Sequence, residues 1–205
     1  MTHLILVRHG ETPWHDENRY AGSSDIGLAA AGRDQAERLA RWAARSDLDE
    51  LCSSPLRRAW ETAAAVGRAT GLEPRPDDRL REIGFGEAEG RTLIELEQLY
   101  PEAVRAFRAD PVTHHLPGGE DPRQAAGRAM ACLRDIAGTH PAARVLLVTH
   151  NTLIRLVLCE LLGLPLSRYR QTFGRMRPCA RTSIELDREA ASLLEYNVPI
   201  DCALP

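Results

Sequence analysis

The chain has 205 residues, enough for one α/β domain or two very small ones, and one domain is the better expectation. Hydrophobic residues make up 43% of it and charged residues 27%, which is ordinary globular usage and argues against a disordered or fibrous protein. The formal net charge of −3 lacks the basic excess of nucleic-acid and membrane-surface binders, so any positively charged site must be local.

The first part of the chain alternates short apolar runs with stretches of helical periodicity. A short apolar run bounded by polar residues is typical of a buried strand, and apolar positions three and four residues apart are typical of a helix. The predicted elements are a strand at 4–7, a helix at 32–45, a strand at 48–53 and a helix at 56–70 that ends at Gly71.

A different kind of segment follows at residues 84–121. It holds two short helical stretches, 93–100 and 102–109, and a loop with several prolines and glycines. Such an excursion between regular elements usually forms a lid beside a site. We therefore expect a single domain over residues 1–205, with a short helical lid at about 84–121.

The last third of the chain returns to alternating strands and helices. The predicted elements are a helix at 122–137, a strand at 144–149, a helix at 153–162 and two strands at 181–186 and 192–198. This alternation favours an α/β three-layer sandwich, with a mostly parallel sheet covered by helices on both faces. The last two strands are expected to form a hairpin at a sheet edge, which leaves pairing into a homodimer open.

The cysteines and the apolar stretches bear on where the protein works. The five cysteines are scattered, odd in number and form no CxxC pair, which fits a reducing compartment better than a disulfide scaffold. No apolar stretch approaches the roughly 18 residues that a membrane span needs, and the N-terminal run is too short for a signal peptide. The sequence therefore predicts a cytoplasmic protein with neither a membrane nor a nucleic acid as partner.

Polar residues follow three of the predicted strands, at the edge where an open parallel sheet binds its ligands. Arg8 and His9 follow the first strand, Ser54 follows the second, and His150 follows the strand at 144–149. All 26 basic residues are arginine, which excludes chemistry that needs a lysine. Two imidazoles among guanidinium groups suit a phosphoryl dianion, because arginine offers forked donors to phosphate oxygens and neutral histidine is a nucleophile. The usual metal-binding motifs are absent, so neither a metal nor a cofactor is expected.

Five motifs in a fixed order carry a resemblance to a known family. They are LVRHGET at 6–12, SSPLRRAWETA at 53–63, LREIGFGEAEG at 80–90, PGGED at 117–121 and VTHNTLIR at 148–155. Together they resemble the histidine phosphatase superfamily, also called phosphoglycerate mutase-like. The resemblance implies the phosphoglycerate mutase-like fold and a small phosphorylated molecule as substrate.

The resemblance also implies a role for each matched residue. His9 stands where the family has the histidine that attacks phosphorus and holds the phosphoryl group covalently. Arg8 and Arg58 stand at phosphate-binding positions, and His150 matches a second histidine that stabilises the transferring group. Glu82 matches the acid that protonates the leaving oxygen and then, as a carboxylate, activates the attacking water.

Several positions depart from the family's usual pattern. His15 stands where many members have asparagine, Ala21 precedes Gly22 where glutamine is frequent, and Asn151 replaces the common glycine after the second histidine. We expect His15, Gly22 and Asn151 among the substrate-binding residues. Because imidazole titrates near neutral pH, His15 predicts phosphate binding that depends more strongly on pH.

The preferred function is a metal-independent phosphomonoesterase that acts on a small phosphorylated metabolite through phosphorylated His9. A cofactor-dependent phosphoglycerate mutase is the alternative, although mutases of this family have a larger insertion with lysine, which this chain lacks. A noncatalytic binder of phosphorylated ligands would be expected to have lost His9, Glu82 or His150, and all three are present. In the lid, His114 and His115 fit a surface loop better than a site, but their place leaves a role in substrate selection open.

Overall fold

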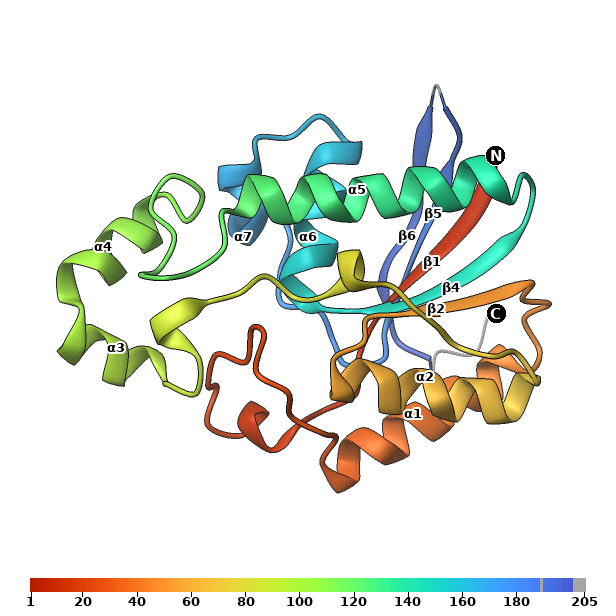
Figure 1. Ribbon diagram of the computed structural model, residues 1–205, viewed down its shortest axis with the longest axis horizontal. Coiled ribbons are helices and arrows are strands. Elements are labelled where there is room, and N and C mark those ends of the chain that lie inside the picture. Colours follow the sequence, from red (N-terminus) through yellow and green to blue (C-terminus); the bar gives the residue numbers. More distant parts are fainter. Residues whose placement is uncertain (189, 201–205) are drawn as a thin grey trace.

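The computed structural model describes residues 1–188 and 190–200, in which six strands form one sheet (Figure 1). The strands are β1 (Thr2–Arg8), β2 (Glu50–Ser53), β3 (Arg75–Pro76), β4 (Arg144–Thr149), β5 (Arg181–Leu186) and β6 (Ala191–Val198). Their order is β3-β2-β4-β1-β5-β6, in which the first four are mutually parallel, while β5 is antiparallel to β1 and β6 to β5. The predicted mostly parallel sheet and its edge hairpin are confirmed. The homodimer stays a prediction.

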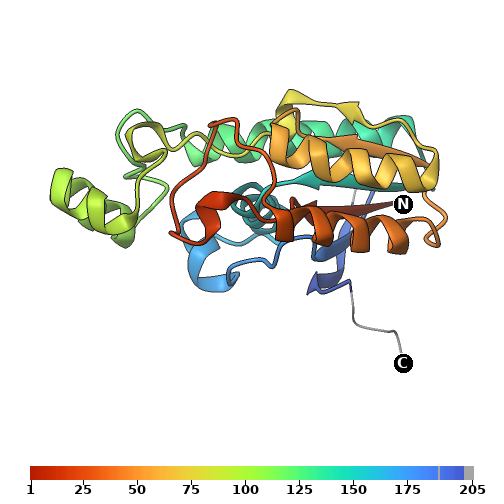
Figure 2. The same cartoon turned by 90° about the horizontal axis from the view of Figure 1, so that it is seen from below.

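Helices cover both faces of this sheet (Figures 1 and 2). The α-helices of the described chain are α1 (Ala30–Ala43), α2 (Arg57–Thr70), α3 (Leu93–Leu99), α4 (Pro101–Ala109), α5 (Pro122–Thr139), α6 (Asn151–Leu161) and α7 (Tyr169–Thr172). Single 3-10 turns lie at Pro13–His15, Asp78–Leu80, Gly86–Ala88 and Leu166–Arg168. Residues of α1 and α2 share one buried cluster with the sheet, and residues of α5 and α6 share the other, which gives the three layers that were expected.

The central strands are apolar along their whole length because both of their faces are buried. In β1, Leu4 and Leu6 pack in the cluster that includes α5 and α6, whereas Ile5 and Val7 pack in the cluster that includes α1 and α2. None of the four is more than 2% exposed. Burying such a side chain contributes about 1.5–3 kcal/mol, so these alternating contacts hold the site-bearing ends of the strands firmly in place.

Each predicted strand and helix occurs within two residues of its expected bounds. The largest functional difference is at α6, which begins at Asn151 directly after β4, with His150 as its N-cap. The sequence placed this start two residues later because Asn151 and Thr152 are polar and interrupt the apolar pattern.

The C-terminal end of α2 is where the sequence predicted it. Gly71 has φ of 79° and closes this helix in the left-handed conformation.

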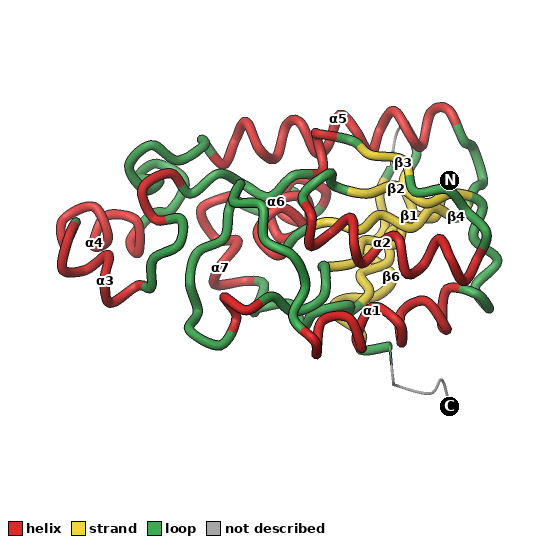
Figure 3. Tube along the Cα trace, turned by 60° about the horizontal axis from the view of Figure 1, so that its bottom comes forward, coloured by secondary structure: helices red, strands yellow, loops and turns green. Residues whose placement is uncertain are grey.

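The lid segment has a small core of its own. Figure 3 shows α3 and α4 projecting to one side of the sheet, beyond the end at which α6 begins. Thr92 and Glu95 form a capping box that fixes the start of α3. The lid core is formed by Ala88, Leu96, Val104, Phe107 and Leu116. Among the residues with described positions, no helix has both the length and the hydropathy to cross a membrane.

Candidate active site

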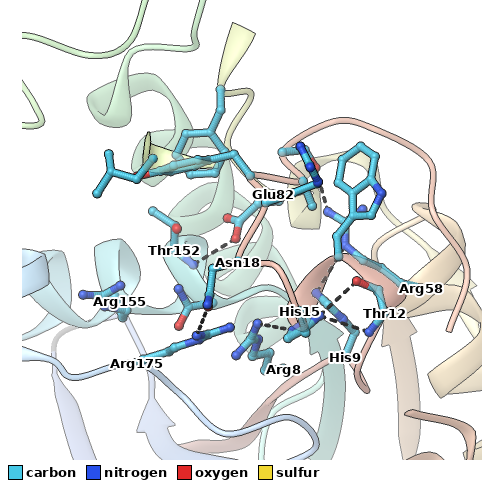
Figure 4. A pocket seen from close by; sticks show the side chains of 18 of the residues that line it. Arg8, His9, Thr12, His15, Asn18, Arg58, Glu82, Thr152, Arg155 and Arg175 are labelled. Carbon is cyan, nitrogen blue, oxygen red and sulfur yellow. Dashed lines mark hydrogen bonds between the residues drawn. The ribbon is translucent and has the colours of Figure 1, made fainter. Parts of the chain in front are cut away.

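A cavity of about 420 Å³ lies at the carboxyl ends of β1 and β4, between the lid and the start of α6 (Figure 4). Most of the expected site residues line it: Arg8, His9, His15, Gly22, Arg58, Glu82 and Asn151. His150 is fully buried behind this surface, and its ring centroid lies 5.1 Å from that of His9. The two histidines meet because β1 and β4 are parallel neighbours in which Arg8 pairs with Thr149, so the next residue of each strand reaches the same place.

His9 is held as a neutral imidazole whose Nε2 carries no proton. Its Nδ1 lies 2.7 Å from the carbonyl oxygen of Gly10, so Nδ1 carries the proton and donates it to that acceptor. Its Nε2 accepts from Arg58 Nε at 3.2 Å. Burial, and then the charges of Arg58 and the neighbouring His150, hold the pKa of His9 well below its usual range. His9 therefore has an unprotonated Nε2 at neutral pH, as a nucleophile requires.

A hydrogen bond with Ser54 sets the tautomer of His150. Ser54 Oγ accepts from the backbone N–H of Leu56 at 3.3 Å and lies 2.8 Å from His150 Nε2, to which we assign its hydroxyl proton. The proton of the ring is then on Nδ1, which is buried and has no hydrogen-bond partner among the described residues. Burial is the main cause that holds the pKa of His150 well below its usual range. An N–H donor thus lies unpaired beside His9.

Arg58 is 1% exposed, and this burial lowers its pKa. Its Nη1 donates to the carbonyl oxygen of Ser24 at 2.7 Å, and its Nη2 donates to that of Gly22 at 2.6 Å. Carbonyl partners orient the guanidinium without neutralising it, so its charge remains available to an anion. Gly22 has φ of 46°, and a Cβ there would overlap the Glu89 carboxylate, which is why this turn needs glycine.

Arg8 forms the second cationic wall of the cavity. Its Nη1 donates to the carbonyl oxygen of Met176 at 2.5 Å, and its Nη2 lies 2.5 Å from His15 Nε2. Its Nε is buried and has no partner in the described chain. Burial, followed by the nearby charge of Arg175, lowers the pKa of Arg8 to about 10, so it remains charged at neutral pH.

His15 does not titrate near neutral pH, contrary to our expectation. Arginine can only donate, so His15 Nε2 must accept from Arg8. The backbone N–H of Thr12 donates toward His15 Nδ1 at 3.0 Å, and Thr12 Oγ1 lies 2.9 Å from the same atom. Because donors face both ring nitrogens, a second ring proton is disfavoured. Burial and the charge of Arg8 lower the pKa of His15 to about 4. The imidazole therefore orients Arg8 as a neutral acceptor, and its titration falls in the acid range.

Glu82 is held at the N-terminus of α6. Its Oε1 accepts from the backbone N–H groups of Ile83 and Leu153, each at 3.0 Å, and its Oε2 accepts from that of Thr152 at 3.0 Å. The helix begins at Asn151, so Glu82 satisfies N–H groups that have no partner within the helix. Only 8% of Glu82 is exposed, and it lines the cavity (Figure 4).

Asn151 lies in the cavity as expected, whereas the polar residues of the lid, His114, His115 and Arg108, lie outside it. Asn151 lines the cavity, but its Oδ1 accepts from the backbone N–H of Met176 at 3.0 Å, so this oxygen fixes a loop. His114 and His115 are exposed and do not line the cavity, which favours the surface-loop interpretation. Arg108, also in the lid, forms an ion pair with Glu97 at 2.6 Å.

Sequence reasoning assigned no role to several lining residues, which are Thr12, Asn18, Arg19, Tyr20, Phe85, Leu93, Thr152, Arg155, Arg170 and Arg175. Thr152 and Arg155 lie within the VTHNTLIR motif, three residues apart. This spacing places both side chains on one face of a helix and could have indicated a shared site. Arg170 and Arg175 lie on α7 and in the loop after it, where no periodic pattern marks them.

Over residues 1–188 and 190–200, no group of three or more histidine, cysteine, aspartate or glutamate residues is arranged to hold a metal ion. The four described cysteines are buried and form no disulfide, and the Cys132 thiol donates to Asp77 Oδ2 at 3.3 Å. Cys202 lies outside the described residues.

Comparisons with known proteins show which relatives the chain has. Phosphoserine phosphatase 1 of Hydrogenobacter thermophilus is 36% identical over 201 residues, which cover 97% of this chain and 93% of the relative. The probable phosphoglycerate mutase GpmB of Escherichia coli O1:K1 / APEC is 32% identical over 185 residues, 90% of this chain and 85% of the relative.

Among solved structures, a mycobacterial glucosyl-3-phosphoglycerate phosphatase complexed with VO3 is 31% identical and superposes with a TM-score of 0.88, covering 97% of this chain and 100% of that one. The family model of the histidine phosphatase superfamily (branch 1) matches residues 4–199, nearly the whole chain. The chain therefore belongs to the histidine phosphatase superfamily.

Proposed function

We propose that this protein is a phosphomonoesterase that hydrolyses a small phosphorylated metabolite through a phosphohistidine at His9. The observation that carries the proposal is the state of His9: a neutral ring, protonated on Nδ1, whose unprotonated Nε2 accepts from the Nε of a buried arginine at 3.2 Å. The names of the phosphoserine and glucosyl-3-phosphoglycerate phosphatases among its relatives support the same class of reaction.

In the first step, His9 Nε2 attacks phosphorus, a P–N bond forms and the P–O bond to the leaving group breaks. Arg8 and Arg58 bind the phosphoryl oxygens, and the unpaired Nδ1–H of His150 donates to the oxygen nearest it. The leaving oxygen takes its proton from the carboxyl group of Glu82.

In the second step, a water molecule gives a proton to the Glu82 carboxylate and attacks phosphorus. The P–N bond breaks, which releases inorganic phosphate and restores both neutral His9 and the protonated acid. The sum is a phosphate monoester plus water giving an alcohol plus phosphate. Each role is carried by a side chain that the fold fixes, so positioning and charge supply most of the rate.

The test is a labelling experiment that compares the wild type with His9→Ala. The wild type, incubated with a radiolabelled phosphomonoester and quenched in base, should carry an acid-labile phosphate on one histidine. His9→Ala should carry none and should lose hydrolysis of p-nitrophenyl phosphate. Chelator should leave the wild-type rate unchanged, because the proposed steps use no metal. Hydrolysis by His9→Ala at the wild-type rate would exclude the mechanism.

A phosphoglycerate mutase is the second candidate, because one relative is named a probable phosphoglycerate mutase. The same phosphohistidine would then return its phosphoryl group to another hydroxyl in place of water. A coupled assay of 3-phosphoglycerate and 2-phosphoglycerate with 2,3-bisphosphoglycerate present separates the two reactions. Interconversion faster than phosphate release would make the mutase the better assignment.

A further inference from the structure

The cavity continues past His9 and Arg58 to a second group of arginines. Arg155 is on α6, Arg170 is on α7 and Arg175 is in the loop before β5, and all three line the same cavity. Figure 4 shows Arg155 and Arg175 on the side of the cavity opposite His9 and Arg58. The primary phosphate site therefore occupies one end of a longer, positively charged cavity.

Arg155 is the buried member of this group, only 8% exposed. Its guanidinium stacks over the ring of Tyr169 at 5.0 Å, and its Nε is buried without a hydrogen-bond partner. No carboxylate pairs with it within the described residues. Because burial disfavours a charge that has no partner, burial lowers the pKa of Arg155, and an incoming anion would supply the missing partner.

The other arginines of the cavity differ because protein acceptors bind their guanidinium groups. Arg8 and Arg58 donate to carbonyl oxygens. Arg19, in contrast, forms ion pairs with Glu17 at 2.7 Å and Glu95 at 2.9 Å, so its charge is already compensated. In the lining of the cavity, Glu82 is the one carboxylate of the described chain, and three backbone N–H groups already bind it.

Arg170 and Arg175 are exposed, but both are oriented by contacts. The Arg170 guanidinium stacks over Phe107 of α4 at 4.9 Å, which ties it to the lid. Arg175 Nη1 donates to Asn18 Oδ1 at 2.6 Å, as Figure 4 shows. Neither contact neutralises the charge, so both arginines add to the positive potential around Arg155.

We propose that Arg155, supported by Arg170 and Arg175, forms a second anion subsite that binds a carboxylate of the substrate. The natural substrate is then the phosphate ester of a small hydroxy acid. This inference rests on the phosphatase proposed above, whose site supplies the first anion position.

The number of buried arginines favours a carboxylate over a second phosphate. The part of the cavity proposed to bind the phosphate dianion has two buried guanidinium groups, Arg8 and Arg58. The proposed second subsite has one, Arg155. One guanidinium group balances the single charge of a carboxylate and can donate two parallel hydrogen bonds to its two oxygens. Arg155 follows Asn151 by four residues on α6, about one helical turn, and both residues line the cavity.

The experiment compares two substrates that differ only at the second anion. 3-Phosphoglycerate carries a carboxylate where glycerol 3-phosphate carries a hydroxymethyl group. The wild type should prefer 3-phosphoglycerate in kcat/KM by about tenfold or more, the worth of a charged hydrogen bond. Arg155→Gln should bring this ratio close to one, and Arg155→Lys should retain part of it.

The matched control is Arg168→Gln, which removes the same charge from an exposed residue of a neighbouring turn that does not line the cavity. It should keep the wild-type ratio. If Arg155→Gln fails to fold, Arg175→Gln replaces it as an exposed variant and should lower the ratio. A ratio that Arg155→Gln and Arg175→Gln leave unchanged overturns the subsite, and so does a wild type that treats both substrates alike.

Two further arms separate this inference from the proposed function and from a phosphate ligand. Titration calorimetry of both compounds with the wild type reports their relative affinity even if neither is hydrolysed. A preference for 3-phosphoglycerate without turnover would support the subsite and contradict the phosphatase. Glycerol 1,3-bisphosphate binding more tightly than 3-phosphoglycerate would overturn the assignment to a carboxylate.

Discussion

Arg8 and His15 are coupled through a hydrogen bond in which Nη2 of the arginine lies 2.5 Å from Nε2 of the histidine. The imidazole accepts, so it must be neutral at this atom, and protonation would place an N–H group against a permanent cation. The neutral histidine thus orients the guanidinium group of Arg8 without adding a second charge.

This pair predicts acid sensitivity of the fold. The pKa of His15 falls from 6.5 to about 4 in the folded protein, so below pH 6.5 the unfolded chain binds a proton that the folded protein does not. Stability should be complete above pH 6.5 and decline between pH 6.5 and pH 4, by roughly 2 kcal/mol from this residue after allowance for its partial exposure.

Urea unfolding at several pH values measures this decline. His15→Asn removes the titrating group, so its stability should fall less steeply over the same pH range. His114→Asn, a change at an exposed residue outside the cavity, should retain the wild-type slope. Equal slopes for the wild type and His15→Asn would show that the Arg8 contact does not hold His15 neutral.

Ser54 predicts a positioning effect on catalysis. Ser54→Ala removes the hydrogen bond to His150 Nε2 and frees the ring to place its proton on either nitrogen. We expect kcat to fall roughly tenfold with a smaller change in KM, because the donor on Nδ1 matters most when charge develops on the phosphoryl group. The control is Ser53→Ala, whose hydroxyl donates to the Ser54 carbonyl oxygen and contacts neither histidine. A change in KM alone, or a change in neither constant, would contradict this role of Ser54.

The strands and helices that carry the site were predictable because local patterns encode them. A four-residue apolar core in β1 and a six-residue run in β4 place His9 and His150 at strand ends, and parallel pairing then brings them together. The two-residue strand β3 and the four-residue helix α7 escaped prediction, since neither is long enough to show a period.

The sequence predicted which residues lie in the site better than it predicted their protonation states and hydrogen bonds. The titration of His15 depends on which atom of Arg8 reaches it, and that contact is set by Met176, which is 168 residues further along the chain than Arg8. Likewise, the sequence shows Arg155 as one polar position in an apolar helix, and its burial without a partner in the lining of the cavity appears only in the folded chain. Such properties arise from tertiary contacts that no local pattern contains.

Gly22 links backbone geometry to phosphate binding. Gly22→Ala would add a Cβ that overlaps the Glu89 carboxylate and lies 2.9 Å from the backbone nitrogen of Phe85, at a positive φ. The turn must shift, and with it the carbonyl oxygen that orients Arg58. We expect inhibition by inorganic phosphate to weaken roughly tenfold and the fold to lose about 1–3 kcal/mol.

Gly127→Ala is the control for that change, because nothing lies within 4 Å of a Cβ added in the middle of α5. It should keep the wild-type inhibition constant and gain about 0.5–1 kcal/mol in stability, since alanine favours a helix. If Gly22→Ala binds phosphate as tightly as Gly127→Ala does, the Gly22 carbonyl is not needed to orient Arg58.

Glu82 gives the sharpest test of proton transfer, because its effect depends on the leaving group. Glu82→Gln keeps the size of the side chain but cannot supply a proton, and its amide nitrogen would oppose one of the backbone N–H groups of α6. Hydrolysis of an alkyl phosphate should fall about 10²- to 10⁴-fold, the usual worth of a general acid. The phosphorylation step with p-nitrophenyl phosphate should fall much less, because nitrophenolate leaves without protonation. A burst of nitrophenol followed by slow turnover would then mark the loss of water activation in the second step. Equal losses on both substrates in the first step would show that Glu82 acts through structure and not as the acid.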